Sequence, residues 1–245
     1  MANDKVYIHE FIDIIGHNRA KYMHHMTANW VPVANRERNM LCYGVWGTVG
    51  STGPWPQTVN MWELDGWHGL ATNLEHELSH PSQQDPALAE WWAQAAHFRR
   101  GGIDRILVPA EWTRSIGELC ADGVQGVGYA HELVTMPPGT SSDYLSALQD
   151  VGQPAVEAFG MQLVGAFAVA MCDDAECVVI WAFPDWQTWA GFEAAEHDDR
   201  LAAWRARQRT MDAAKRRMLM VDAPLSPLRI GRQPAESDRR PLDEI

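Results

Sequence analysis

Hydrophobic and polar positions alternate first with the period of a strand and then with the period of a helix. Val6 to Asp13 alternates and is rich in β-branched and aromatic residues, which predicts a strand. After a turn at Gly16, apolar residues recur at helical spacing from His17 to Trp30. Pro32 is expected to end this helix, because proline interrupts the hydrogen-bond ladder.

The rest of the first half continues with strand, turn and helix patterns. These predict a hairpin, two helices and a closing strand, at Leu41–Val49 with Thr58–Leu64, Asp65–Leu78, Ala87–Arg100 and Ile103–Pro109. Gly50 to Pro56 supplies the hairpin turn, and Gly101-Gly102 is expected to stop the second helix. The order is therefore β-α-β-β-α-β, the ferredoxin-like arrangement, with its second helix in two pieces.

The second half of the chain repeats this pattern. Val6–Phe11 returns as Gly128–Leu133 at an offset of 122 residues. Further matches in the same order are Tyr22 with Tyr144, Pro32 with Pro154, Trp62 with Trp181 (offset 119), and Arg105-Ile106-Leu107 with Arg217-Met218-Leu219 (offset 112). Such self-similarity indicates an internal duplication. We predict ferredoxin-like repeats at 1–110 and 128–222, a linker at 111–127 and an extended or disordered tail at 223–245.

Each predicted sheet has one face covered by its own helices and one face left bare. An antiparallel sheet does not leave a broad apolar surface in water, so the two bare faces are expected to pack on each other. This predicts an α+β pseudo-dimer resembling a barrel, with room for a cavity between the sheets. The fused pair could dimerise again as a homodimer.

The tandem arrangement with a tryptophan in the third strand resembles the dimeric α/β-barrel superfamily, and its NIPSNAP-like branch most of all. Met61-Trp62-Glu63-Leu64-Asp65 is similar to that branch's Leu-Trp-x-Tyr-x pattern, and Thr135 to Gly139 resembles its Pro-Gly turn after strand one. Where that branch often has an arginine in strand one, this chain has Glu10 and Glu132. The resemblance implies enzymes such as monooxygenases, isomerases, cyclases and dehydratases.

Composition narrows the function classes. The chain has 245 residues, 46% of them hydrophobic, and a net charge of −12. This charge argues against a general nucleic-acid surface or an anionic-membrane surface, which need clustered basic residues. We expect no signal peptide and no membrane span, because apolar runs are short. The four cysteines have no metal-ligand spacing. A cytoplasmic location follows as the default expectation.

The reactive residues are unevenly divided, since eight of the ten histidines lie in repeat one. This predicts that repeat one carries the working pocket. By the family resemblance Glu10 faces the cavity between the sheets and His9 faces the helices. Desolvation there would raise the pKa of Glu10 and suit it to general acid–base work. The alternative is that Glu10 and Glu132 pair with arginines at the sheet edge.

Other candidates line the same predicted pocket. Tyr43 and an inward-facing His24 or His25 would orient polar atoms of a substrate. Tyr22, Trp46 and Trp62 would bind it, with the tryptophans as aromatic walls. Core packing is the alternative role for each aromatic residue.

Two cofactor possibilities also arise. His76-Glu77-Leu78-Ser79-His80 matches the HExxH zinc motif, but Pro81 should end the helix at or before His80. His97 is the best axial ligand if the chain resembles haem-binding relatives. Neither metal nor haem is required, and we expect no cofactor. The sequence therefore predicts a cofactor-independent enzyme for a small hydrophobic or aromatic molecule; alternatives are a non-catalytic binding or scaffolding protein and a haem-binding member of the superfamily.

Overall fold

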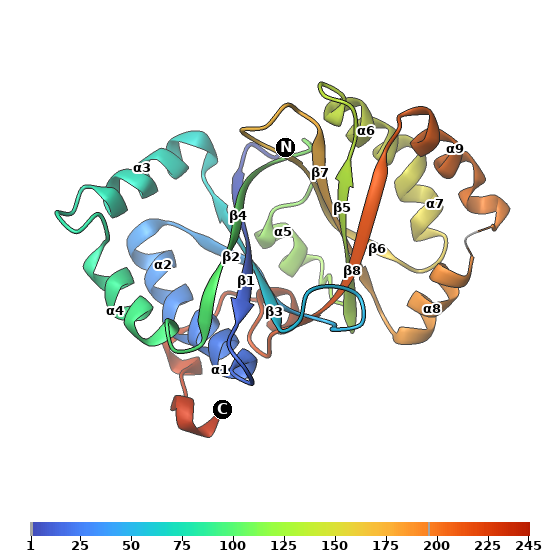
Figure 1. Ribbon diagram of the computed structural model, residues 1–245. Coiled ribbons are helices and arrows are strands. Elements are labelled where there is room, and N and C mark those ends of the chain that lie inside the picture. The colour runs from blue at the N-terminus through green and yellow to red at the C-terminus, as the bar shows by residue number, and fades with distance from the viewer. Residues whose placement is uncertain (1, 196) are drawn as a thin grey trace.

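In the computed structural model, which describes residues 2–195 and 197–245, the two predicted repeats form a single closed antiparallel barrel (Figure 1). The strands follow each other around it in the order β1-β3-β2-β8-β5-β7-β6-β4. Their bounds are β1 (Val6–Ile14), β2 (Leu41–Thr48), β3 (Gln57–Leu64), β4 (Arg99–Pro109), β5 (Gly128–Thr135), β6 (Gln162–Val169), β7 (Glu176–Phe183) and β8 (Ala214–Asp222). β2 pairs with β8 and β4 with β6, so both edges of each predicted sheet are joined to the other repeat.

Helices cover the outside of the barrel in two groups, one for each repeat (Figure 1). The first group is α1 (Arg19–His24), the π-helical η1 (His25–Trp30), α2 (Val31–Arg38), α3 (Gly66–Leu78) and α4 (Pro86–Ala95). The second is α6 (Ser141–Ala147), the π-helical η2 (Leu148–Gly152), α7 (Gln153–Glu157), α8 (Trp186–Ala194), the 3₁₀ turn η3 (Asp199–Leu201) and α9 (Ala202–Thr210). No helix within the described residues is both long and apolar enough to cross a membrane.

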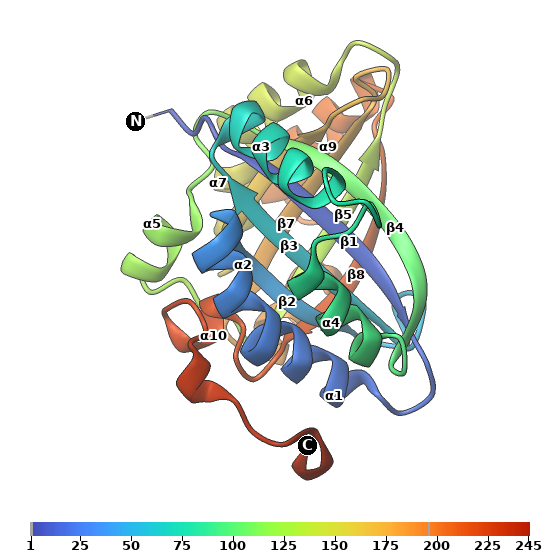
Figure 2. The same cartoon turned by 90° about the vertical axis from the view of Figure 1, so that its left-hand side faces the viewer.

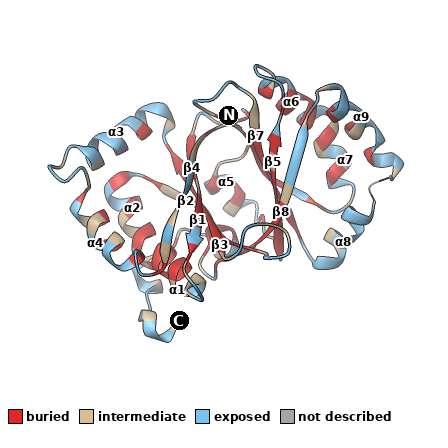
Figure 3. Ribbon diagram, in the orientation of Figure 1, coloured by how far each residue is buried: buried red, intermediate tan, exposed pale blue. Residues whose placement is uncertain are grey.

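The buried residues form three layers (Figure 3). One cluster lies between each sheet and its helices, and the third fills the barrel, with Tyr7, Tyr43, Trp46 and Phe167 among its members. The predicted α+β pseudo-dimer is therefore confirmed. The barrel is packed with side chains at its centre rather than hollow throughout.

One end of the barrel is covered by the linker and the tail (Figure 2). The linker forms α5 (Ile116–Ala121) and the tail begins with α10 (Pro227–Ile230), and both place side chains in the barrel cluster. The tail then contains η4 (Glu236–Asp238) and η5 (Leu242–Glu244), where the sequence predicted an extended or disordered segment. Its Gln233 side chain bonds both the backbone N–H and C=O of Cys42. These local contacts had no periodic signature in the sequence.

Two predicted helix ends were wrong. The first helix does not stop at Pro32: the π-helical turn ends at Trp30, and Pro32 lies in the first turn of α2, where no backbone N–H is needed. α4 ends at Ala95, earlier than the predicted Arg100, and β4 already begins at Arg99. The longer strand brings Arg99 onto the sheet.

In the last strand of each repeat, the pairing shows that the sequence alignment of the two repeats is off by one residue. Glu10 lies opposite Asp104, and its counterpart Glu132 lies opposite Arg217, so the structural offset in this strand is 113 and not 112. A slip of one residue exchanges the two faces of a strand. The residue equivalent to Arg217 is therefore Asp104, and the residue equivalent to Arg105 is Met218.

Candidate functional site

The two candidate residues of strand β1, His9 and Glu10, point to the opposite faces of the sheet from those predicted. Glu10 lies on the helix side, where its carboxylate contacts the Trp62 and Asn60 side chains. His9 is fully buried inside the barrel. Neighbouring strand residues point to opposite faces, so the alternation was correct and only the assignment of faces was wrong. The carboxylate thus belongs to a site between the sheet and its helices.

A chain of polar groups connects Glu10 to the interior of repeat one. The Asn60 amide nitrogen donates to Glu10 Oε2 at 2.9 Å and also to the Tyr22 hydroxyl at 2.9 Å. The Trp62 indole N–H donates to the same Oε2 at 3.1 Å. Asn60 and Tyr22 are fully buried, whereas Glu10 is only partly buried. The carboxylate is therefore the accessible end of a buried network.

The surroundings of Glu10 favour its neutral form. Burial, followed by the nearby Asp104 carboxylate, raises the pKa of Glu10 to about 6, although Asn60, Trp62 and Arg99 act in the opposite direction. The amide oxygen Oδ1 of Asn60 is buried and has no hydrogen-bond partner in the described part of the chain. The site therefore contains a carboxyl group with a pKa near neutrality, Glu10, hydrogen-bonded to an amide whose own oxygen has no described partner, Asn60.

Repeat two has a glutamate at the same place with a different environment. The Arg217 guanidinium binds Glu132 Oε1 at 2.5 Å and Lys215 lies 3.6 Å from that oxygen. Burial alone would raise the pKa of Glu132, but the two cations outweigh it and lower this pKa to about 2. Val179 replaces Asn60 in this repeat. Glu132 thus matches the arginine-paired alternative, and Glu10 does not.

His9 meets His131, the same residue of the other repeat, in the middle of the barrel. Their Nε2 atoms are 3.1 Å apart and both rings are fully buried. Burial and Arg105 lower the pKa of His131 to about 3, and burial likewise lowers the pKa of His9. Both rings are therefore neutral, with one donating to the other. The shared offset of 122 was the signal in the sequence that could have found this contact.

The predicted aromatic walls lie on different sides of the sheet. Tyr43 and Trp46 are inside the barrel, and the Tyr43 hydroxyl donates to the Val164 carbonyl oxygen at 2.9 Å. Tyr22 and Trp62 lie on the helix side with Glu10. The structure therefore brings together Glu10, Tyr22 and Trp62, and separates Tyr43 and Trp46 from them. Asn60 and Asp104 complete the cluster and were absent from the prediction.

His24 and His25 are buried where α1 and η1 pack against α4 and the tail. His25 Nε2 is 3.0 Å from the Trp91 carbonyl oxygen, and its ring stacks on the Trp91 indole. His24 accepts from the Arg240 backbone N–H of the tail at 3.1 Å. Their ring nitrogens have partners in the packing of helices and tail. Both side chains are thus buried, but their hydrogen-bond partners are Trp91, Asn29 and Arg240 rather than Glu10, and their role toward a substrate stays a prediction.

The HExxH segment does not form a zinc helix. α3 ends at Leu78, before His80, as Pro81 predicts. Glu77 is held by Arg38 in an ion pair of 2.5 Å. His76 and His80 lie 3.6 and 3.9 Å from Asp85, whose other oxygen caps α4. No group of three or more metal-ligating side chains is found among the described residues.

His97 does not fit the role of a haem ligand. It lies in an exposed turn after α4 rather than on a long helix. The neighbouring surface hollow carries charged side chains, including Arg36, Glu90 and Glu236. A haem pocket needs an apolar enclosure that this surface does not provide.

Comparison with known proteins shows likeness in fold rather than in sequence. Neither a family model nor a curated protein sequence matches the chain. A monooxygenase candidate from Lactobacillus acidophilus is similar over 89% of this chain and 94% of its own, with 6% identity and a TM-score of 0.57. An anthrone oxidase-like protein is similar over 90% of this chain and 94% of its own, with 11% identity and a TM-score of 0.56.

A NIPSNAP family protein of unknown function from Agrobacterium tumefaciens matches 40% of this chain and 91% of its own length, with 23% identity and a TM-score of 0.34. The two full-length matches cover both repeats at once. The chain therefore has the dimeric α/β-barrel fold, with both halves of the barrel joined in one polypeptide.

Proposed function

We propose that the protein is a cofactor-independent acid–base enzyme for a small hydrophobic or aromatic molecule, and that Glu10 is its general base. The observation that carries this proposal is the partly buried carboxylate of Glu10, which forms no ion pair with any described residue and whose pKa burial and Asp104 raise to about 6. A group with a pKa near the working pH exchanges protons most effectively. Glu10 meets this condition without a metal or an organic cofactor.

The geometry assigns different tasks to the two oxygens of Glu10. Oε2 accepts both hydrogen bonds, from Asn60 and from Trp62, and is therefore held in position. Oε1 has no hydrogen bond or ion pair with any described residue, and it is the oxygen that would take the substrate proton. The unused Oδ1 of Asn60 would accept a hydrogen bond from a substrate hydroxyl.

The names of the full-length structural neighbours support a reaction of the oxygenase type. In such a reaction Glu10 removes a proton from an acidic CH₂ group beside an aromatic ring, which leaves a carbanion. Dioxygen, as the second substrate, takes up the electrons, and the CH₂ becomes a carbonyl with release of one water molecule. Proton removal is the step for which this chain supplies a residue.

The same carboxylate argues against a purely structural role for this site. In a scaffold, buried carboxylates are expected in ion pairs, as Glu132 is with Arg217. Glu10 instead lies opposite another carboxylate, Asp104. An arrangement that keeps a carboxyl group uncompensated costs stability, and such costs are typical of functional sites.

Hydrogen–deuterium exchange at the CH₂ of anthrone, followed by NMR in D₂O, tests the proposal without requiring the complete reaction. The wild-type protein should accelerate exchange above buffer, and Glu10→Gln should reduce the acceleration at least about 100-fold. Glu132→Gln is the matched control, because it changes the equivalent residue of repeat two. Folded Glu132→Gln protein should accelerate the exchange as the wild-type protein does. Equal exchange in wild-type protein and Glu10→Gln would remove Glu10 from the mechanism.

A further inference from the structure

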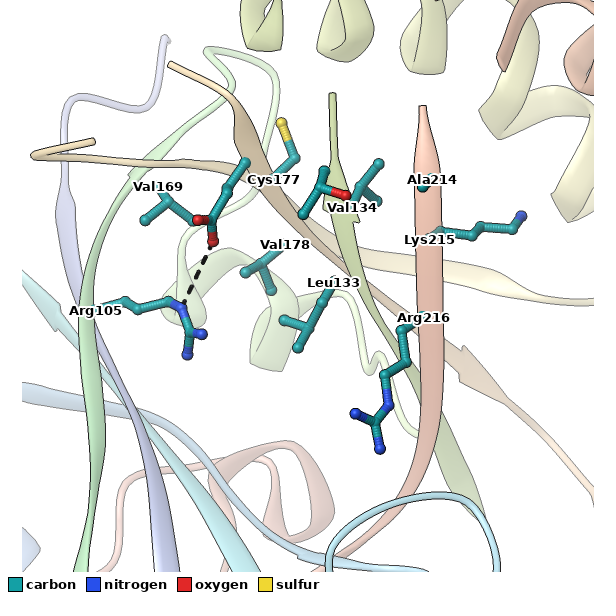
Figure 4. A pocket seen from close by; sticks show the side chains of 11 residues that line it. Arg105, Leu133, Val134, Val169, Cys177, Val178, Ala214, Lys215 and Arg216 are labelled. Atoms are coloured by element: carbon teal, nitrogen blue, oxygen red, sulfur yellow. Dashed lines mark ion pairs between the residues drawn. The ribbon is translucent and has the colours of Figure 1, made fainter. Parts of the chain in front are cut away.

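The end of the barrel opposite α5 and α10 contains a cavity that the proposed reaction does not use. It has a volume of about 370 Å³ and is bordered by β4, β5 and β8 (Figure 4). A second cavity of about 210 Å³ shares Arg105, Leu133 and Arg216 with it. Together the two cavities form a site, here called the barrel mouth, and these three residues lie where the cavities meet. Glu10 and its network lie on the other face of β1.

Arg105 supplies the strongest sign of a ligand. Its Nη1 atom is buried and has no hydrogen-bond partner within the described chain. The nearest carboxylate, Glu176, is 4.0 Å from Nε, which is beyond hydrogen-bond length. The guanidinium carbon lies 5.5 Å from the centre of the Phe11 ring. A buried guanidinium donor without an acceptor is costly, so an incoming anion would be bound favourably.

Arg216 enters the barrel mouth from the opposite wall. Figure 4 shows Arg105 on β4 and Arg216 on β8 with Leu133 and Val178 between them, while Lys215 points away. Among the residues described, none forms an ion pair or side-chain hydrogen bond with Arg216. The other carboxylate at the rim, Asp13, is bound by the Gln57 amide at 3.0 Å. Arg216 is thus available, and Arg105 has only the 4.0 Å ion pair of its Nε with Glu176, in a protein whose net charge is −12.

Apolar side chains form most of the rest of the barrel mouth, although Thr135 and Glu176 also line the larger cavity and Asp13 and Gln57 the smaller one. Leu133, Val169 and Val178 line the larger cavity, and Phe11 and Met218 line the smaller one. The His9–His131 pair next to Phe11 is neutral, so it adds no charge of either sign. Largely apolar walls with two cationic groups fit a ligand that has an apolar body and an anionic head.

We propose that the barrel mouth binds a small monocarboxylate with an apolar or aromatic body, held by Arg105 and Arg216. The planar guanidinium groups match the two oxygens of a carboxylate, and the apolar body replaces water against Leu133 and Val178. This site is distinct from the proposed catalytic cluster and does not depend on it.

Calorimetric titration with benzoate, at low and at physiological salt, tests the site. Benzyl alcohol, which has a similar apolar body without the charge, is the matched ligand. Benzoate should bind and benzyl alcohol should bind at least about tenfold more weakly. Arg105→Met places in β4 the residue that β8 has at the equivalent position, and Arg216→Gln changes an exposed residue. Each should weaken benzoate binding about tenfold or more.

Glu10→Gln should leave benzoate binding unchanged, which separates this proposal from the catalytic one. Absence of benzoate binding to the wild-type protein would overturn the proposal. It would also be overturned by equal binding of benzyl alcohol, or by unchanged benzoate affinity in both arginine variants. If Arg105→Met does not fold, Arg216→Gln alone decides the question.

Discussion

Glu10 and Glu132 occupy the same position in the two repeats, yet their carboxylates are held in opposite states. Each accepts a hydrogen bond from the tryptophan of its third strand, Trp62 or Trp181. On the neighbouring strand Glu10 faces Asp104 and Glu132 faces Arg217. The pKa of Glu10 is about 6 and that of Glu132 about 2. The charged residues of the last strand, Asp104 in repeat one and Lys215 with Arg217 in repeat two, therefore account for much of the difference.

This difference shows how a duplicated fold can divide its tasks. In repeat two the carboxylate and the arginine complete each other and tie β5 to β8. In repeat one no described cation forms an ion pair with Glu10, and Arg99 only partly offsets burial and Asp104, which leaves a carboxyl group that can gain and lose a proton near neutral pH. The same backbone thus supports a structural ion pair on one side and a candidate acid–base group on the other.

The largest expected effect comes from breaking the ion pair of repeat two. Arg217→Met leaves the Glu132 carboxylate, whose side chain is 5% exposed, with Lys215 as its nearest cation. Removing one partner of a buried pair should lower the free energy of unfolding by about 3–5 kcal/mol. Asp104→Met is the control at the equivalent, exposed position, and should change stability by less than about 0.5 kcal/mol. Similar losses in urea unfolding of both variants would contradict the distinction between the repeats.

A smaller effect concerns the pH dependence of stability. The folded-state pKa of Glu10 is raised from 4.5 to about 6, so its contribution to stability is present below pH 4.5 and is lost as the pH rises through 6. The loss is about 2 kcal/mol at most. Glu10→Gln should remove this slope in unfolding free energies measured between pH 4 and 7. A slope unchanged in the variant would mean that Glu10 titrates normally.

Glu132 should act with the opposite sign. Its pKa is lowered from 4.5 to about 2, so its contribution is present above pH 4.5 and is lost as the pH falls toward 2. The same series of unfolding experiments, extended to acid with Glu132→Gln, distinguishes the two glutamates. Each variant serves as the control for the other.

Placing an arginine opposite Glu10, as Arg217 lies opposite Glu132, should give Glu10 the lowered pKa of an ion-paired carboxylate. Asp104→Arg places a cation opposite Glu10 and should lower the pKa of Glu10 from about 6 to below about 5, by NMR titration of the side-chain carboxyl carbon. Asp104→Asn removes the negative charge without adding a positive one, and should give an intermediate pKa. If the pKa of Glu10 in both variants is the same as in the wild-type protein, Asp104 has no part in raising it.

The fold could be predicted because the duplication and the periodicity agree. The faces of β1 could not, because both sides of this barrel wall are buried and alternation alone does not tell them apart. The one-residue slip in the last strand arose from matching Arg105 with Arg217, two arginines that lie on opposite faces. The sequence does not show which residues of β4 lie opposite those of β1, and this register identifies the equivalent residues of the two repeats.

Part of the site could be predicted as well. Glu10, Tyr22 and Trp62 were all candidates and lie together, although their grouping with Tyr43 and Trp46 was wrong. Asn60 had a signal that went unused, because it is the polar residue where Val179 stands in repeat two. Differences between aligned repeats were therefore more informative than the shared aromatic residues.

The last and smallest expected effect is the coupling of about 1 kcal/mol between His9 and His131, a pair in which both repeats have the same residue. His9→Leu or His131→Leu alone leaves a buried ring nitrogen without its partner and should cost about 1–3 kcal/mol in urea unfolding. The double variant removes both polar rings, so it should cost less than the two single losses added together, by about 1 kcal/mol. His24→Leu with His131→Leu is the control, because His24 contacts the tail on the outside and should combine additively. Additivity in the His9–His131 pair would mean that the contact on the pseudo-twofold axis contributes nothing to joining the repeats.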